Sequence, residues 1–254
     1  YFSVDGNLGL IAVSKAASGP SAKLASLNAA NFTMTTDVAL DKLPAGGVYL
    51  HQLMARVNGS DLYRLVLRVE TNGGIKLYVS KVVSGVETTL KTYTNTTFGY
   101  TAGQRLNLRF DVHGASPTVL EGKVWPVGSA EPSVPAVKTT DSTATLQGPG
   151  QVGITAYTGS GMTSLPLTAS VDQFLVASYV DNNQPPVADF VATPNGATVS
   201  FDASTSSDAD GTIETYDWDF GDGSSGTGAN APHTFAASGT YSVVLTVIDD
   251  NGAK

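Results

Sequence analysis

Two aspartates in a glycine-containing turn are the clearest candidates for metal chemistry. Asp208 and Asp210 are followed directly by Gly211, so two carboxylates project from one tight turn. Alternate oxygen ligands before a glycine suit a hard cation such as calcium, which takes about 6–8 oxygen ligands. The EF-hand pattern is absent, because no glutamate stands at the required spacing after Gly211. Aspartates that cap their own backbone would explain the same turn, so both interpretations stay open.

Arginine and aromatic side chains in the first part of the chain could form a sugar site. Such sites need aromatic faces for stacking and planar polar groups for hydroxyls. Arg64 and Arg68 fall on one face of one predicted strand, and a concave sheet lined by arginine suits an acidic sugar or carboxylate. The alternative is an aromatic core with solvated arginines. The predicted ligand-binding residues are Arg56, Tyr63, Arg64, Arg68 and Trp125, with Tyr49, His51 and Tyr157 as further candidates.

Residue types for nucleophilic catalysis are scarce. The chain has no cysteine, which excludes cysteine nucleophiles, thiolate metal sites and disulfides. His51, His113 and His233 are scattered, and no Gly-x-Ser-x-Gly elbow occurs. We therefore predict no catalytic residue and no enzymatic activity.

Charge is unevenly distributed over the 254 residues. Residues 1–186 hold 13 basic and 12 acidic side chains, whereas residues 187–254 hold 1 basic and 10 acidic side chains. An acidic second half argues against nucleic-acid binding, which needs clustered lysine and arginine. No apolar run approaches the ~20 residues of a membrane helix, so no membrane span is expected.

The elements that must position these residues are strands. Residues 62–70, 75–83 and 106–113 alternate apolar and polar side chains, which is typical of strands with one face in a core. Asn72-Gly73-Gly74 predicts a hairpin turn between the first two, since Asn and Gly accept positive φ. Further strands are predicted within 122–125, 151–157 and 170–178. Residues 16–30 are rich in alanine but contain Gly19-Pro20, so we predict strand and loop rather than helix.

A domain boundary follows the strand-like segment that ends near Tyr179. Residues 180–186 are polar and end in Pro185-Pro186, which favours an extended, stiff linker. We predict one domain over residues 1–179 and a second over residues 187–254.

The second domain resembles a PKD domain, which implies an immunoglobulin-like β-sandwich. The most specific string is Trp218-Asp219-Phe220-Gly221-Asp222-Gly223. Trp218 and Phe220 lie on one side of a strand and can fill a sandwich core, while Gly-Asp-Gly makes a tight turn. The match is completed by Pro185-Pro186-Val187-Ala188, Val199-Ser200-Phe201-Asp202, His233-Thr234-Phe235, Gly239-Thr240-Tyr241 and residues 243–249.

This resemblance implies roles for single residues. Some PKD domains bind calcium at the matching acidic turn, which nominates Asp208, Asp210 and Asp249 as ligands of a structural calcium ion. His233 is expected to be a structural polar residue. The family pattern continues with one more strand after Asp250, so the last strand is expected to be missing. Either the piece is cut there, or another chain supplies the strand to the open sheet edge.

The first domain resembles the concanavalin A-like, or laminin-G-like, jelly roll of bacterial secreted proteins. The resemblance rests on Leu40-Asp41-Lys42, Gly46-Gly47-Val48-Tyr49, residues 63–68, Gly122-Lys123-Val124-Trp125 leading to Glu131-Pro132, residues 150–154 and residues 171–176. It implies an all-β sandwich whose N-terminal strand is missing. Such modules often directly precede PKD domains.

The jelly roll also hosts glycoside hydrolases, which need two carboxylates about 5–10 Å apart. On this fold the pair usually comes from a Glu-x-Asp-x-x-Glu strand, and none occurs. Glu70 and Glu121 could meet across strands, but solvated surface acids explain both. A divergent glycosidase is thus the least favoured class.

We therefore predict a non-catalytic binding and spacer segment of a larger secreted or cell-surface protein. The jelly roll would recognise a polysaccharide or surface glycan, and the PKD domain would act as spacer. The alternative is a purely structural stalk or assembly subunit of a surface fibre, adhesin or phage tail, whose partners are neighbouring domains or subunits. The chain begins at Tyr1 without an initiator methionine or leader, which is expected of a trimmed piece.

Overall fold

The computed structural model describes residues 2–5, 8–180, 183–250 and 252–254. The chain divides into two compact units, Tyr1–Val180 and Asp181–Lys254. The division lies after Val180, the first residue of the predicted linker. Each unit has its own apolar core.

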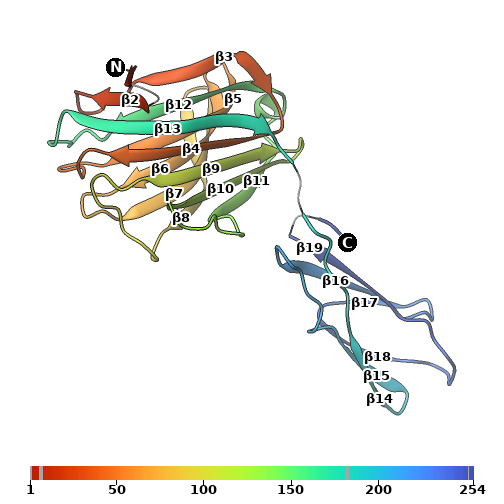
Figure 1. Ribbon diagram of the computed structural model, residues 1–254. Coiled ribbons are helices and arrows are strands. Elements are labelled where there is room, and N and C mark those ends of the chain that lie inside the picture. The colour runs from red at the N-terminus through yellow and green to blue at the C-terminus, as the bar shows by residue number, and fades with distance from the viewer. Residues whose placement is uncertain (1, 6–7, 181–182, 251) are drawn as a thin grey trace. The chain divides into compact units, whose positions relative to one another are not determined.

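The first unit is a sandwich of two antiparallel sheets (Figure 1). In spatial order, sheet I consists of β1 (Phe2–Asp5), β2 (Leu8–Val13), β13 (Leu167–Ser178), β4 (Phe32–Leu40), β9 (Leu106–His113), β10 (Thr118–Pro126) and β11 (Val137–Asp141). Sheet II consists of β3 (Ser21–Ala29), β12 (Gly150–Thr158), β5 (Tyr49–Asn58), β6 (Asp61–Val69), β7 (Ile75–Val83) and β8 (Val86–Thr94). A short 3₁₀ turn, η1 (Ala144–Leu146), lies between β11 and β12. Strands distant in sequence are neighbours in both sheets, and the predicted jelly-roll sandwich is confirmed.

Side-chain alternation explains how the two sheets bury their inner faces. In β6, Tyr63, Leu65 and Leu67 are buried in the core between the sheets. Arg64 and Arg68 alternate with them and therefore point to the outer face of sheet II. Each fully buried aliphatic side chain contributes about 1.5–3 kcal/mol.

Two glycines are required by local geometry. Gly73 has φ +79° in the turn between β6 and β7, where the side chain of Asn72 accepts a hydrogen bond from the Gly74 N–H at 2.9 Å. This is the predicted hairpin. Gly122 in β10 lies where the two sheets approach closely, since a Cβ atom there would stand 2.3 Å from Leu65 Cδ1.

Strand β8 is the outermost strand of sheet II in the part of the chain that the structure describes. Every residue of β8 is exposed or half-buried. Its threonines and charged residues suit an edge strand, because polar side chains discourage pairing with other chains. The absence of alternating burial explains why the sequence did not predict this strand.

The second unit is a smaller sandwich. Sheet III consists of β14 (Val191–Asn195), β15 (Thr198–Asp202) and β18 (Asn230–Thr234), and sheet IV of β17 (Ser225–Thr227), β16 (Ile213–Asp219) and β19 (Val244–Asp249). Trp218 and Phe220 are buried together, as predicted, and Trp218 Nε1 donates a hydrogen bond to the Gly228 carbonyl at 2.9 Å. Strand β19 lies at the edge of sheet IV as far as the described residues extend.

Candidate functional site

The outer face of sheet II carries polar and aromatic side chains in register across β6 and β7. Val66 stands opposite Tyr78, and Arg68 stands opposite Lys76. Because their sequence neighbours fill the core, these four side chains share the outer face. The face therefore places a phenol beside two cations.

A hollow of about 410 Å³ lies over β6, β7 and β8 on this face. That volume is within the range of small-ligand pockets, about 300–1,000 Å³. A second hollow of about 420 Å³ shares Lys76 with it. The first hollow is lined by Arg68, Lys76, Tyr78, Glu87, Thr89 and Thr92, and we refer to it as the β6–β8 groove.

Ion pairs hold the cations of this face in place. Arg68 makes two hydrogen bonds to Glu70, from Nε to Oε1 at 2.9 Å and from an Nη atom to Oε2 at 3.3 Å. Lys76 Nζ lies 3.4 Å from Glu70 Oε1. Arg64 lies 3.4 Å from Glu87 Oε2, and the Glu87 Oε1 atom accepts a hydrogen bond from the Ser80 hydroxyl at 2.6 Å. The groove thus has positioned donors and acceptors.

Electrostatics keep these groups in defined protonation states. Burial alone would raise the pKa of Glu70, but Arg68 and Lys76 outweigh it and hold that pKa below its usual value. Burial, together with the charge of Glu87, raises the pKa of Tyr78. Glu70 is therefore a carboxylate and Tyr78 a neutral phenol near neutral pH.

An exposed aromatic ring lies on the same face, towards the other edge of sheet II. Tyr157 in β12 stands opposite Leu50 in β5, which in turn stands opposite Arg68. The Tyr157 side chain is exposed, whereas its neighbour Ala156 is buried. A flat ring in this position can stack on a sugar.

The structure brings together only part of the predicted ligand set. Arg64 and Arg68 lie on the outer face of sheet II with Val66 between them, and Arg68 lines the groove. Sequence reasoning did not include Lys76, Tyr78, Glu70 or Glu87 in the set. Pairing the two predicted strands through the Asn72 turn would have placed Lys76 and Tyr78 beside β6.

Arg56 was predicted to contact a ligand, and the structure places it inside the sandwich. Its relative exposure is 0%. The register of β5 shifts after Ala55, and Arg56 has φ +47°, so this bulge turns the side chain inwards. The guanidinium donates hydrogen bonds to the carbonyls of Ala30, Gly114 and Leu146, so it stabilises loops and is not available at the surface.

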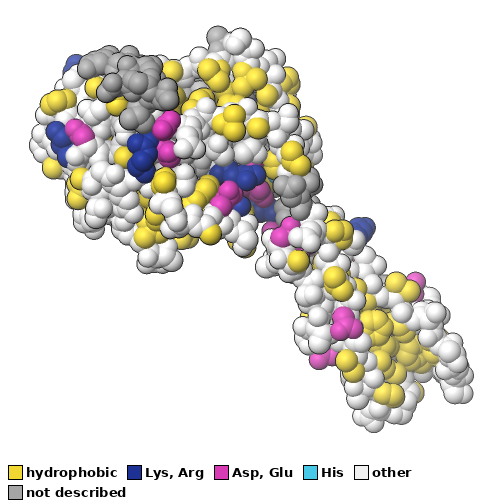
Figure 2. Space-filling model, viewed as in Figure 1, with side chains coloured by type: hydrophobic (Ala, Val, Ile, Leu, Met, Phe, Trp, Pro, Cys, Tyr) yellow, Lys and Arg dark blue, Asp and Glu magenta, His cyan; other side chains and the backbone are white. Residues whose placement is uncertain are grey.

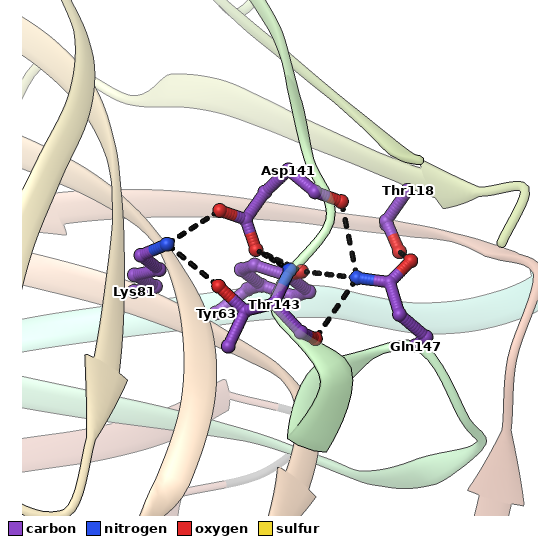
Figure 3. Close-up of polar contacts among 6 residues, drawn as sticks. All are labelled: Tyr63, Lys81, Thr118, Asp141, Thr143 and Gln147. Atoms are coloured by element: carbon purple, nitrogen blue, oxygen red, sulfur yellow. Dashed lines mark hydrogen bonds and ion pairs between the residues drawn. The ribbon is translucent and has the colours of Figure 1, made fainter. Parts of the chain in front are cut away.

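Tyr63 is likewise a buried residue, although it was predicted to be at the ligand site. Its hydroxyl donates to Asp141 Oδ2 at 2.8 Å, and Lys81 Nζ lies 2.6 Å from Asp141 Oδ1 (Figure 3). The amide of Gln147 donates to the carbonyls of Asp141 and Thr143 (Figure 3). Burial and Asp141 raise the pKa of Tyr63. This polar network ties β11 and the η1 turn to sheet II, which is a structural role.

Trp125, the last of the predicted set, lies on the opposite face of the sandwich. In β10, Leu120 and Val124 are buried in the core, so Glu121 and Trp125 point to the outer face of sheet I. Trp125 therefore cannot share a ligand with Arg68. Figure 2 shows basic and acidic side chains adjoining one another on the surface turned to the viewer.

The two glutamates considered as a catalytic pair do not meet. Glu70 follows β6 in sheet II, whereas Glu121 belongs to β10 in sheet I. The carboxylic acid opposite Glu121 is Asp111, which is buried and binds Arg109 at 2.8 Å. Asp111 is thus held in an ion pair within sheet I and does not bring Glu121 and Glu70 together.

The candidate calcium ligands lie around Gly211 in the second unit. A Cβ atom at Gly211 would stand 2.6 Å from Asp208 Oδ2 and 2.3 Å from Asp250 Oδ1, so both oxygens converge there. Asp208 Oδ2 is buried and has no hydrogen-bond partner among the described residues. Asp210 accepts a hydrogen bond from the Gln184 N–H, at 3.2 Å from Oδ2.

The third predicted calcium ligand, Asp249, is occupied by other groups. It is buried and accepts hydrogen bonds from Asn183 at 2.6 Å and from the Ala253 N–H at 2.9 Å. Within the described parts of the chain, no group of three or more histidine, aspartate or glutamate side chains converges closely enough to hold a metal ion. The donor set for calcium is therefore partial.

Ser224, His233 and Asp222 form a cluster with the composition of a catalytic triad but not its geometry. The Ser224 hydroxyl and Asp222 Oδ2 both lie near His233 Nε2, at 3.3 and 2.8 Å. A triad needs its acid on the other ring nitrogen, so that Nε2 can accept the serine proton. His233 also stacks on Phe220, with ring centroids 4.2 Å apart.

The sequence of the second unit matches a known family. Residues 183–254 match the family described as "PKD domain". Residues 183–254 form a PKD domain. Similar segments occur in "Collagenase ColA" of Clostridium perfringens (48% identical over 54 residues, 21% of this chain and 5% of that protein) and "Pre-pro-metalloprotease PrtV" of Vibrio cholerae (46% over 77 residues, 30% and 8%). The chain spans less than a tenth of these curated relatives, 5% and 8% of their lengths.

Solved structures resemble mainly the first unit. The carbohydrate-binding module CBM66 from Bacillus subtilis has a TM-score of 0.48 at 14% identity, covering 70% of this chain and 91% of that one. The CBM2 module of the evolved Dit protein of Lactobacillus casei BL23 phage J-1 has a TM-score of 0.46 at 13% identity, covering 71% and 80%. A family 16 endo-glucanase from Bacteroides ovatus has a TM-score of 0.46 at 8% identity, covering 69% and 84%. At these identities the likeness concerns the fold alone.

No helix in the described residues is long and apolar enough to cross a membrane.

Proposed function

We propose that the first unit is a non-catalytic polysaccharide-binding module of a secreted or cell-surface protein, and that the PKD domain is its spacer. The supporting observation is the β6–β8 groove, in which Arg68, Lys76 and Glu87 present planar or charged groups beside the Tyr78 phenol. Sugars are bound by such convergent polar groups next to aromatic surface. The adjoining hollow, which shares Lys76, gives room for more than one sugar unit.

The test is binding to a panel of polysaccharides by affinity gel electrophoresis and isothermal titration calorimetry. We expect saturable binding to at least one polymer, and Arg68→Ala to weaken it by about tenfold or more, which is the loss of about 1.4 kcal/mol. Trp125→Ala, on the outer face of sheet I, is the matched control and should bind like the unmodified protein. Equal loss in both variants, or no binding to any polymer, would contradict the proposal.

Assembly through protein contacts is the second candidate, and one observation favours it. The PKD domain has an apolar hollow of about 950 Å³ lined in part by Phe190, Phe235 and Tyr241. Figure 2 shows apolar side chains gathered on this unit. Exposed apolar patches of this kind often mark protein contacts. Sedimentation velocity at rising concentration distinguishes the candidates, since a polymer-binding spacer stays monomeric.

Calcium in the PKD domain is part of the proposal, at Asp208, Asp210 and Asp249. The buried, unpartnered Oδ2 atom of Asp208 supports it, among the residues described. Binding would require Asp210 and Asp249 to exchange their present hydrogen bonds for the ion. We expect millimolar calcium to raise the unfolding temperature of this domain, and Asp208→Asn to abolish the rise. An unchanged unfolding temperature would contradict calcium binding and favour the alternative, in which the aspartate side chains only cap the backbone of their own turn.

A further inference from the structure

The cations on the outer face of sheet II around the β6–β8 groove are already paired with carboxylates of the same face. Arg64, Arg68 and Lys76 each have a glutamate oxygen within 3.4 Å. Glu70 serves two of them, because it binds Arg68 through two nitrogens and also contacts Lys76. These are three cations and two carboxylates, so the ion pairs reduce the charge of this face to +1.

A carboxylated sugar would meet competition and repulsion here. The two-pronged geometry that a carboxylate prefers on arginine is already used by Glu70 at Arg68. An incoming carboxylate must displace Glu70 or lie close to it, and Glu87 lines the same groove. Like charges a few ångströms apart repel strongly where water is partly excluded, and an adjacent fixed charge is a common device against the wrong ligand.

An uncharged sugar faces neither obstacle. A hydroxyl group both donates and accepts hydrogen bonds, so it can lie between the ammonium of Lys76 and a glutamate oxygen. The side chains remain accessible, with relative exposures of 41% for Lys76 and 42% for Glu87. Thr89 and Thr92 add hydroxyl groups on the β8 wall.

We infer that the β6–β8 groove selects uncharged glycan chains over carboxylated ones. This inference rests on the proposed function and specifies the chemical class of its ligand. It differs from the expectation drawn from the arginines alone, which favoured an acidic sugar. The reason for the change is that Arg64 and Arg68 are already paired with glutamates.

The experiment compares pairs of polymers that share a backbone, in which one member carries carboxylates and the other carries hydroxyl groups in their place. Hydroxyethyl cellulose is paired with carboxymethyl cellulose, and carboxyl-reduced polygalacturonate is paired with polygalacturonate. Affinity gel electrophoresis at 0.15 M salt, about physiological ionic strength, gives a dissociation constant for each member. Where a pair binds, we expect the uncharged member to bind about tenfold or more tightly.

Charge-neutral variants test the cause of the preference. Glu87→Gln keeps the size of the side chain but removes the repulsion, so the carboxylated member should gain affinity and the preference should narrow by about threefold or more. Glu131→Gln, on the sheet I side of the sandwich, is the matched control and should leave the ratio unchanged. Circular dichroism checks that both variants fold.

The outcomes separate this inference from the proposed function. Tighter binding of the carboxylated members, or an unchanged ratio in Glu87→Gln, overturns the inference while polysaccharide binding stands. If the protein binds neither the members of these pairs nor any polymer of the wider panel, both the inference and the proposed function are overturned.

Discussion

At the scale of single residues, a few polar side chains are buried among the apolar side chains of the first unit. His51 lies in the core at 0% exposure, and the Tyr49 hydroxyl is 3.1 Å from its Nδ1 atom. Burial lowers the pKa of His51 to about 3. The imidazole is therefore neutral in the folded protein at any ordinary pH.

This residue predicts a specific loss of stability in acid. Below pH 6.5 the unfolded chain takes up a proton on His51, whereas the folded protein does not do so until about pH 3. The unfolded state is thus favoured as the pH falls through this window, by about 1.4 kcal/mol for each pH unit. Urea unfolding between pH 7 and 4 should show a shallower pH dependence in His51→Phe than in the unmodified protein. Parallel curves would contradict the prediction.

Arg56 gives a second prediction at this scale. Its guanidinium satisfies carbonyl groups of three loops, including those of Ala30 and Gly114. Arg56→Met would leave these buried acceptors without donors, and we expect a loss of about 3–5 kcal/mol in the free energy of unfolding. Lys91→Met, at an exposed position in β8, is the control and should change it by less than about 0.5 kcal/mol. Chemical denaturation measures both.

At the scale of elements, the spacing of the two sheets depends on Gly122. A Cβ atom there would lie 2.3 Å from Leu65 Cδ1 and 2.8 Å from Val137 Cγ2, so Gly122→Ala must push β10 away from sheet II. We expect a loss of about 1–3 kcal/mol. Leu65→Val in the same chain should recover part of it. Gly148→Ala is the matched control, since nothing lies within 4 Å of its Cβ position, and its unfolding midpoint should be unchanged or slightly higher.

Sequence reasoning succeeds for elements wherever one face is buried and the other is not. Alternation in residues 62–70 and 75–83 predicts strands that the structure places at Asp61–Val69 and Ile75–Val83. The turn at Asn72 follows from residues that accept positive φ. Strand β8 was not predicted, because neither of its faces is buried and its sequence therefore lacks the alternation of apolar and polar residues.

The candidate site was harder to predict, because alternation says which residues share a face but not which sheet the strand joins. Trp125 and Arg68 both point outwards, yet they belong to opposite sheets. The inward turn of Arg56 depends on a bulge and on carbonyl groups distant in sequence. Neither the bulge nor these distant contacts can be recognised in the residues around Arg56. Glu70 stands two residues after Arg68 on the same predicted face, so that pair can be read from the sequence. Glu87 becomes the partner of Arg64 only through the pairing of β6, β7 and β8.

At the scale of the whole molecule, two units with separate cores should unfold separately. The PKD domain has its own cluster around Phe201, Trp218 and Phe220, and domains with independent cores commonly melt as independent units. We expect two calorimetric transitions. Trp218→Phe, which loses the bond to Gly228, should lower one transition temperature and leave the other within about 1 °C. A single transition that shifts as a whole would contradict this.

The position of the β8 wall has a consequence for how this protein can diversify. Thr89 and Thr92 line the groove but stand on a strand whose residues are all exposed or half-buried. Exchanges at such positions cost little packing, typically within about 0.5 kcal/mol. Ligand preference can therefore drift from one lineage to another by changes along this strand, while the sandwich beneath is inherited intact.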